Sequence, residues 1–185
     1  MKHIPPHYTE IDKSLYEMDC RRYPKKGCGV ILFFLRCFRW QQNRKSGFIK
    51  CMLKIFMKII KTFYCLEIPN NLTVGGGLYI GHPYCITING NAILGENINI
   101  HKGVTIGQEN RGRRRGAPTI GNNVWIGINS SIVGKITIGN DVLIAPNSYV
   151  NCDIPSHSVV LGNPCIIKSV ENATDGYINF LNEDV

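Results

Sequence analysis

Between residues 66 and 168 the hydrophobic positions recur with a period of six. Neither an α-helix, with a period of about 3.6, nor an alternating strand, with a period of about 2, produces this spacing. A six-residue unit fits a short strand followed by a tight corner, where glycine or asparagine takes the bend. The aliphatic members of the period are Ile68, Val74, Ile80, Leu94, Ile100, Ile106, Ile120, Ile126, Ile132, Ile138, Ile144 and Val150. Three units would complete one triangular turn, so the pattern predicts a mainly β fold, a β-helix of about four to five stacked turns.

Two interruptions of the period indicate where the chemistry lies. The first, between Ile80 and Ile88, spans eight residues and contains His82. The second, between Ile106 and Ile120, spans fourteen residues and contains the basic run Arg111-Gly112-Arg113-Arg114-Arg115-Gly116. Insertions into a repeat array commonly form its binding face, so we expect the functional site beside these two segments.

The region before the repeat is predicted to be helical. Residues 1–26 form an irregular arm with one short helix around Asp12–Asp19, and two further helices cover Val30–Gln42 and Phe48–Tyr64. The longest uninterrupted apolar stretch is far shorter than the roughly 20 residues that cross a bilayer. The chain therefore divides into N-terminal arm and helices (1–65), a β-helix domain (66–168) and an acidic tail or short helix (169–185).

Four lysines form a stripe on the helix predicted at Phe48–Tyr64. Lys50, Lys54, Lys58 and Lys61 recur at helical spacing, and apolar side chains occupy the other faces. One interpretation is a solvated face on a helix that packs against the main domain. The other is an interfacial helix on anionic lipid, that is, a peripheral membrane contact.

Charge and cysteine usage narrow the class of protein. The net charge of +8 suits a phosphate-bearing partner such as a phosphorylated cofactor, a nucleic acid or an anionic membrane. The eight cysteines include no C-x-x-C pair, so no metal centre is expected. The polar, acidic N-terminus does not resemble a signal peptide, so we expect a cytoplasmic location. Within the cytoplasm, the protein is either free or attached to the inner face of the membrane.

Several motifs in the repeat resemble the serine acetyltransferase branch of the hexapeptide-repeat acyltransferases, together with the related O-acetyltransferases of sugars and polysaccharides. The resemblance covers Leu66 to Lys168. Its carriers are Gly77-Leu78-Tyr79-Ile80-Gly81-His82, Ile100-His101-Lys102-Gly103-Val104-Thr105-Ile106-Gly107, Pro118-Thr119-Ile120-Gly121-Asn122-Asn123-Val124-Trp125-Ile126-Gly127, Asp153-Ile154-Pro155 and Val160-Leu161-Gly162-Asn163-Pro164. It implies a left-handed parallel β-helix, a homotrimer, and acetyl-CoA as co-substrate in a groove between neighbouring β-helices.

The resemblance also assigns catalytic and cofactor-binding residues. His82 corresponds to the general base, and Glu67 precedes it by the fifteen residues that separate the family's carboxylate from its histidine. An imidazole of near-neutral pKa can take the proton of an acceptor hydroxyl, and a carboxylate can orient the ring. His101 is interpreted as structural. The positions that match the pantetheine groove are Gly107, Gly127, Ile128 and Pro146, with Lys168 as a phosphate contact.

The chain departs from the serine enzymes on the acceptor side. Gly81, Gly116 and Ala117 stand where those enzymes carry charged residues that would hold an amino acid. We therefore expect an O-acetyltransferase that acts on a sugar or polysaccharide precursor, with serine O-acetylation as the alternative. The Arg113–Arg115 cluster is either solvated or a contact for CoA phosphates or an anionic glycan.

Two other classes are disfavoured by the sequence. A zinc-dependent β-helix enzyme needs three histidine ligands, and only His82 and His101 lie in the coils. Nucleic-acid binding would rest on one basic loop without aromatic platforms. Neither a metal nor a nucleic acid is expected.

Overall fold

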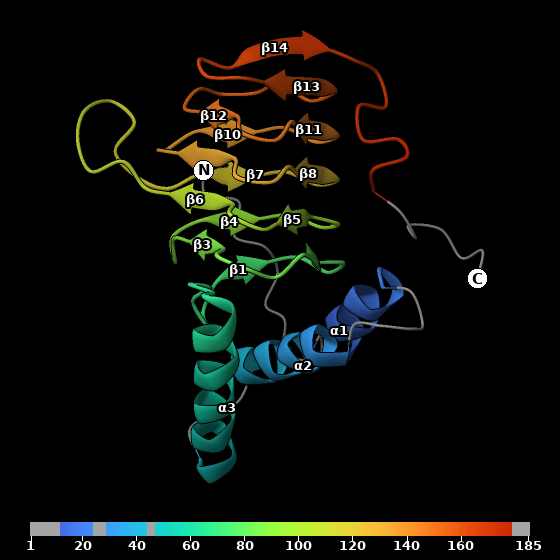
Figure 1. Ribbon diagram of the computed structural model, residues 1–185, viewed down its shortest axis with the longest axis vertical. Coiled ribbons are helices and arrows are strands. Elements are labelled where there is room, and N and C mark those ends of the chain that lie inside the picture. Colours follow the sequence, from blue (N-terminus) through green and yellow to red (C-terminus); the bar gives the residue numbers. More distant parts are fainter. Residues whose placement is uncertain (1–11, 24–28, 44–46, 179–185) are drawn as a thin grey trace.

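The computed structural model describes residues 12–23, 29–43 and 47–178. Its helices are α1 (Asp12–Arg21), α2 (Gly29–Asn43) and α3 (Phe48–Tyr64), which confirms the three predicted helices. They lie at one end of a stack of strands, and α3 points away from that stack (Figure 1). Within the described ranges, no helix combines the length and the apolar character needed to cross a bilayer.

The strands form three sheets, one for each side of a triangular coil. The first sheet contains β1 (Thr73–Val74), β4 (Ile93–Leu94), β7 (Thr119–Ile120) and β10 (Thr137–Ile138). The second contains β2 (Tyr79–Gly81), β5 (Asn99–His101), β8 (Val124–Ile126), β11 (Val142–Ile144), β13 (Ser158–Leu161) and β14 (Ile166–Ser169). The third contains β3 (Thr87–Ile88), β6 (Thr105–Gly107), β9 (Ser131–Val133) and β12 (Tyr149–Val150). Neighbouring strands are parallel except β13 and β14, so the predicted parallel β-helix is confirmed.

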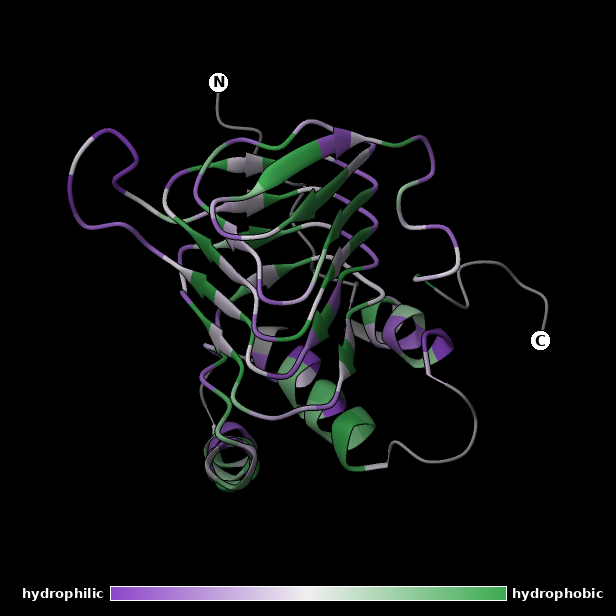
Figure 2. Cartoon of the chain, turned by 45° about the horizontal axis from the view of Figure 1, so that its top comes forward, coloured by the Kyte–Doolittle hydropathy of each residue, from purple (hydrophilic) through white to green (hydrophobic). Residues whose placement is uncertain are grey.

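The core is the set of aliphatic columns that the period of six predicts. Every period residue from Ile68 to Val150 is at most 7% exposed, and those from Ile120 onward are at most 2% exposed. Aligned partners such as Ile100 and Ile126 stack directly from one coil to the next. Figure 2 shows this hydrophobic character along the strands and a hydrophilic loop between β6 and β7. Each turn therefore covers the face that its neighbour cannot cover alone.

The glycines that follow the aliphatic residues are required by the close stacking of the coils. A Cβ on Gly95 would lie 2.6 Å from the carbonyl oxygen of Gly121, and one on Gly121 would lie 2.7 Å from that of Gly139. Real Cβ atoms do not approach backbone atoms so closely. Beside this column the Asn122 amide donates to Oδ1 of Asn140 at 2.8 Å, so side chains also link successive corners.

A buried ion pair attaches α1 and α2 to the first coil. The Arg39 Nε donates to Asp19 Oδ2 at 2.8 Å, and both side chains are at most 1% exposed. Arg39 also donates to the carbonyl oxygen of Val74, and Asp19 accepts from the Leu78 amide, each at 2.8 Å. These bonds reach backbone groups of the coil, so the helices cap the open end of the β-helix.

Candidate active site

His82 stands at the corner between β2 and β3, inside the first interruption of the period. Its backbone is in the left-handed region, with φ of 56°, and its carbonyl oxygen accepts from the Tyr84 amide at 2.8 Å. Tyr84 in turn accepts from the Gly103 amide at 3.0 Å, and Cys85 donates to the carbonyl oxygen of Tyr64 at 3.0 Å. The loop is therefore fixed on two sides while the His82 side chain remains exposed.

A second histidine packs beside His82. The ring centroids of His82 and His101 are 6.3 Å apart, and the His101 ring lies against Gly81. A Cβ on Gly81 would lie 2.7 Å from that ring, so only glycine leaves this space to His101. Burial, and to a smaller extent His82, lower the pKa of His101, while a backbone hydrogen bond at Gly81 opposes the shift. His101 is therefore neutral near pH 7, and its buried Nε2 has no hydrogen-bond partner among the described residues.

A hollow of about 220 Å³ opens next to His101 on the outer face of the second sheet. We call it the aromatic hollow; it is lined by Arg22, Tyr79, Asn99, His101, Trp125, Gly176 and Tyr177. The Trp125 ring lies 4.8 Å from His101 and 5.1 Å from Tyr177, between ring centroids. The hollow therefore has aromatic walls, and its lining residue His101 packs beside His82.

Arg22 brings a buried cation to the aromatic hollow from the end of α1. Its guanidinium donates to Asn99 Oδ1 at 2.7 Å and to the carbonyl oxygen of Gly77 at 3.1 Å. Burial lowers the pKa of Arg22 to about 10, which still leaves the side chain charged at neutral pH. Asn99 also donates to the carbonyl oxygen of Tyr177 at 3.1 Å. The side-chain amide of Asn99 thus links Arg22 to the C-terminal segment.

Asp141 fixes the C-terminal segment that carries Tyr177. Its carboxylate accepts from the Ala173 and Thr174 amides, at 3.0 and 2.9 Å, and from the Thr174 hydroxyl at 2.7 Å. His157 Nδ1 lies 2.8 Å from the same carboxylate. Burial alone would raise the pKa of Asp141, but these hydrogen bonds outweigh it and lower the pKa. Residues 170–178 form turns, and the remainder of the predicted tail, 179–185, lies outside the described residues.

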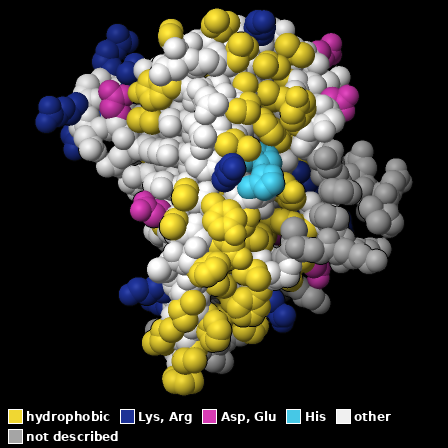
Figure 3. All heavy atoms as spheres, viewed as in Figure 1, with side chains coloured by type: hydrophobic (Ala, Val, Ile, Leu, Met, Phe, Trp, Pro, Cys, Tyr) yellow, Lys and Arg dark blue, Asp and Glu magenta, His cyan; other side chains and the backbone are white. Residues whose placement is uncertain are grey.

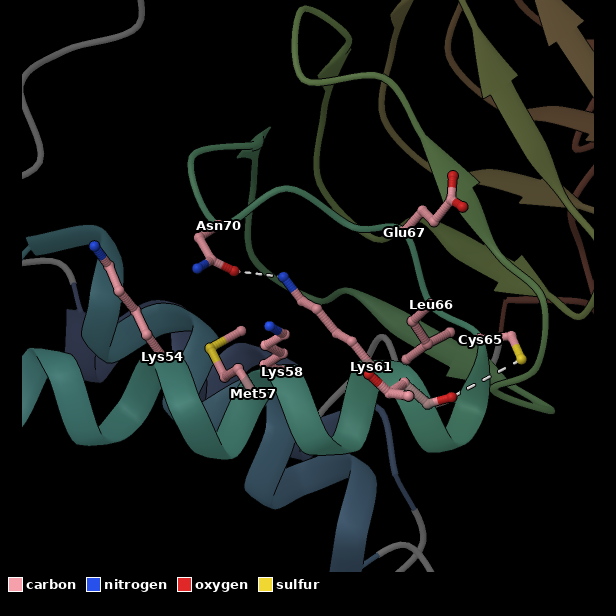
Figure 4. Close-up of a pocket in the computed structure, with 9 residues that line it drawn as sticks. Lys54, Met57, Lys58, Lys61, Cys65, Leu66, Glu67 and Asn70 are labelled. Carbon is pink, nitrogen blue, oxygen red and sulfur yellow. Dashed lines mark hydrogen bonds between the residues drawn. The ribbon is translucent and has the colours of Figure 1, made fainter.

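Glu67 lies on the third sheet, beside the strand that follows the loop of His82. Its backbone pairs with Thr87 of the third sheet, and its side chain is exposed. Figure 4 shows the carboxylate turned away from α3. Among the described residues, no hydrogen bond or ion pair joins this carboxylate to His82. The spacing of fifteen residues places both near the start of the β-helix, but their roles as a catalytic pair stay a prediction.

The predicted cofactor positions lie at different places on the coils. Gly127, Ile128 and Pro146 share the corner between the second and third sheets, above His82, whereas Gly107 ends β6 and Lys168 is exposed on β14. A Cβ on Gly127 would lie 2.6 Å from the Pro146 nitrogen, so packing of the coils requires this glycine. At Gly107 a Cβ would meet only Thr105 and Val133, at 3.8 Å. Because packing leaves that position open, Gly107 fits a backbone strip along which a ligand lies.

The basic run of the second interruption projects from the coil as a closed loop (Figure 1). Glu109 and Gly116 exchange backbone hydrogen bonds of 3.0 and 2.9 Å at its base. Arg114 donates to Glu109 at 3.0 Å, while Arg113 and Arg115 are exposed. Arg111 is exposed as well, so the loop presents three exposed cations besides Arg114 beyond the surface of the coils. In the described part of the chain, no three His, Cys, Asp or Glu side chains are grouped to hold a metal.

Comparison with known proteins decides between the families that the sequence resembles. The family described as bacterial transferase hexapeptide (six repeats) matches residues 117–152. A serine acetyltransferase from Helicobacter pylori is 33% identical over 129 residues, which cover 70% of this chain and 75% of that protein. The chain belongs to the serine acetyltransferase family.

Two further serine acetyltransferases are similar to the chain, one in sequence and one in structure. The serine acetyltransferase of Staphylococcus xylosus is 33% identical over 113 residues, which cover 61% of this chain, and the chain spans about half (52%) of that protein. The Neisseria gonorrhoeae serine acetyltransferase, solved in complex with serine, superimposes with a TM-score of 0.70 at 27% identity, covering 85% of this chain and 69% of that one.

The prediction of a sugar or polysaccharide acceptor is wrong. These relatives are serine acetyltransferases, which support the alternative. The prediction assumed that no other polar or charged side chain lies near the positions that lack the charged groups, and the structure shows that such side chains do lie there. At Gly81 the vacated space is filled by the His101 ring, and a cation reaches the same face from Arg22 of the helical region. A comparison of aligned motifs alone could not show either replacement.

The site contains residues that sequence reasoning missed. Tyr79, Asn99 and Trp125 each precede a residue of the period, at Ile80, Ile100 and Ile126, and stack in one outward row. Counting back one position from each period residue would have grouped them. Arg22 and Tyr177 lie outside the repeat, so no such signal points to them.

Proposed function

We propose that this protein transfers the acetyl group of acetyl-CoA to the hydroxyl of serine, with His82 as general base. The observation that carries the proposal is the similarity to the serine acetyltransferase of H. pylori across three quarters (75%) of that protein. The exposed imidazole of His82 at an interruption of the coils supplies the base that the reaction needs.

In the proposed reaction the serine hydroxyl attacks the thioester directly. His82 takes the hydroxyl proton as the oxygen bonds to the acetyl carbon, and the carbon–sulfur bond then breaks. The imidazolium returns the proton to the departing CoA sulfur, so the base is regenerated and no acyl-enzyme forms. The neighbouring His101, whose pKa burial lowers, is neutral and adds no positive charge beside the base.

The aromatic hollow is our candidate for the serine subsite. Its 220 Å³ accommodate a small amino acid, and it begins beside His101, whose ring lies 6.3 Å from that of His82. The Arg22 cation favours a carboxylate there, and the aromatic faces of Trp125 and Tyr177 suit an ammonium group. These groups stand in for the charged residues that Gly81, Gly116 and Ala117 lack.

The donor side and the assembly are also proposals. We place acetyl-CoA along Gly107, Gly127, Ile128 and Pro146, with Lys168 or the projecting arginines near its phosphates. A homotrimer would set these surfaces against a neighbouring chain, and would cover the His82 side chain that a single chain leaves exposed. Glu67, on the third sheet, would then face a groove between chains.

The proposal is tested by incubating the full chain with acetyl-CoA and serine. CoA release is followed with a thiol reagent, and O-acetylserine by mass spectrometry. We expect stoichiometric formation of both products. CoA release that needs another hydroxyl acceptor, with no O-acetylserine formed, would overturn serine as the substrate.

A further inference from the structure

The helix α3 has one face packed and the opposite face exposed. On the packed face Met57 is fully buried, and Leu53 and Ile60 lie against the core. The opposite face carries six large hydrophobic side chains between 40% and 81% exposed, which we call the outer face of α3: Phe48, Met52, Ile55, Phe56, Ile59 and Phe63. Single exposed apolar residues need no explanation, but a contiguous face of this kind indicates a partner.

The apolar surface continues from α3 onto α2. Phe33 of α2 is 45% exposed and its ring centroid lies 6.2 Å from that of Phe56. Trp40, two helical turns further along α2, is also exposed. In Figure 3 these helices form one hydrophobic area below the β-helix. The area therefore belongs to the surface of two helices and is broad enough to lie on a flat partner.

Basic side chains border this area. Lys54 and Lys58 are exposed along one edge of α3, and the guanidinium of Arg36 lies 5.8 Å from the centre of the Trp40 ring on α2. Figure 3 shows Lys and Arg side chains on both sides of the hydrophobic area. An apolar face bordered by cations, with a tryptophan beside one of them, is the composition of helices that lie in the headgroup region of a bilayer.

The lysine edge also borders a hollow of about 750 Å³ between α3 and the first coil, lined among others by Lys54, Lys58, Lys61 and Asn70 (Figure 4). Lys61 is held inside by the carbonyl oxygen of Ile68 and by Asn70, and burial lowers its pKa. Lys54 and Lys58 extend to its outer side. The hollow thus offers two exposed ammonium groups on an edge of α3, and ammonium groups of this kind bind the phosphates of an anionic membrane surface.

We propose that the outer face of α3 docks on an anionic lipid surface, with its hydrophobic side chains among the lipid chains and Lys54 and Lys58 at the phosphates. A second copy of this chain is the competing occupant. Antiparallel pairing of two outer faces would bring their lysine edges to the same side, and like charges oppose that contact. A negatively charged bilayer satisfies both the apolar face and the cations, and the net charge of +8 favours it further.

Docking would bring the candidate active site close to the membrane. The α3 helix ends at Tyr64, whose ring centroid lies 5.0 Å from that of Tyr84 in the loop of His82. The proposal accords with the cytoplasmic location at the inner face of the membrane that the sequence predicts. It does not depend on acetyl transfer to serine, so each can fail while the other holds.

Vesicle co-sedimentation tests the proposal with the full chain. We expect strong binding to phosphatidylcholine vesicles that contain phosphatidylglycerol, weak binding to phosphatidylcholine alone, and loss of binding as salt is raised. Ile55→Asn with Ile59→Asn should reduce partitioning about a hundredfold. Ile93→Asn is the matched control, because Ile93 is 43% exposed on β4, far from the helices in sequence, and should leave binding unchanged.

The lysines are tested separately. Lys54→Gln with Lys58→Gln should lower binding to anionic vesicles about thirtyfold and leave binding to neutral ones unchanged. Arg113→Gln with Lys135→Gln removes the same charge from exposed positions outside the helices, one on the projecting loop and one on the coils, and should have little effect. An equal loss in both pairs would show that only total charge matters and would overturn the proposed docking.

Trp40 reports whether the helices enter the lipid. Its fluorescence, read in a Trp125→Phe background that leaves one of the chain's two tryptophans, should shift to the blue on anionic vesicles. Absence of binding in the unmodified chain would overturn the proposal. So would sedimentation showing that Ile55→Asn with Ile59→Asn dissociates an assembly while vesicle binding stays unchanged, because the outer face would then be buried between copies.

Discussion

The coils and α3 both repeat hydrophobic residues at regular spacing, yet they place them in opposite environments. The period residues of the coils are at most 7% exposed, whereas those on the outer face of α3 are at least 40% exposed. Each coil is covered by the next one, while α3 packs on one side only. Regular spacing of hydrophobic residues therefore predicts that an element has a hydrophobic face. The elements packed around it decide whether that face is buried or exposed.

The largest expected difference between the two regions comes from shortening one isoleucine side chain in each of them. Ile126→Ala should destabilise the protein by about 4 kcal/mol, because Ile126 is fully buried between two coils and leaves a cavity. Ile59→Ala, the same truncation at a side chain 61% exposed, should change the free energy of unfolding by less than about 0.5 kcal/mol. Urea unfolding without lipid measures both. Similar losses would mean that α3 is covered in solution.

Substitutions at two glycines of the coils distinguish a residue needed for stacking of the coils from a residue proposed to bind acetyl-CoA. Gly127→Ala should destabilise by about 3 kcal/mol, because its Cβ would lie 2.6 Å from the backbone nitrogen of Pro146. Gly107→Ala should leave the unfolding free energy nearly unchanged, since the nearest atoms are at 3.8 Å, but should weaken acetyl-CoA binding. Thermal unfolding and calorimetric titration distinguish these outcomes. Full stability in Gly127→Ala would show that the coils can separate there.

The smallest expected effect is a pH dependence of stability that comes from His101. Because its pKa is lowered in the folded protein, the unfolded chain binds this proton more readily as the pH falls below about 6.5. Stability should therefore fall with pH from about 6.5 down to the folded pKa, by at most about 1.4 kcal/mol per pH unit. His101→Gln should remove that part of the slope, measured by urea unfolding between those pH values. An unchanged slope would mean that other groups produce it.

The regular part of the structure could be predicted because each coil repeats one local rule. The period placed Ile126 and its equivalents in the core, and its first interruption located His82. Contacts between the repeat and other segments were not predictable in this way. Arg22 and Tyr177 reach the aromatic hollow from outside the repeat, and their spacing relative to the coils is not fixed by any period.

The prediction of a sugar acceptor was wrong because it rested on the absence of charged side chains at Gly81, Gly116 and Ala117. It took no account of side chains that reach the same region from other parts of the chain. Gly81 looked like the loss of a binding group, whereas in the structure it makes room for the His101 ring. The fifteen-residue spacing suggested that Glu67 and His82 act as a pair, and this stays a prediction: Glu67 pairs with Thr87 on the third sheet, and His82 stands at the corner that leads into that sheet. Sequence spacing fixes which coil a residue occupies more firmly than the direction of its side chain.

The most direct test of the proposed chemistry is the turnover of His82→Ala with acetyl-CoA and serine. If His82 is the general base, kcat should fall by about a thousandfold, while calorimetry should show an unchanged Kd for acetyl-CoA. The His82 side chain is exposed, so its removal should leave the fold intact. An unchanged kcat in a variant that still binds acetyl-CoA would contradict the role of His82 as the base.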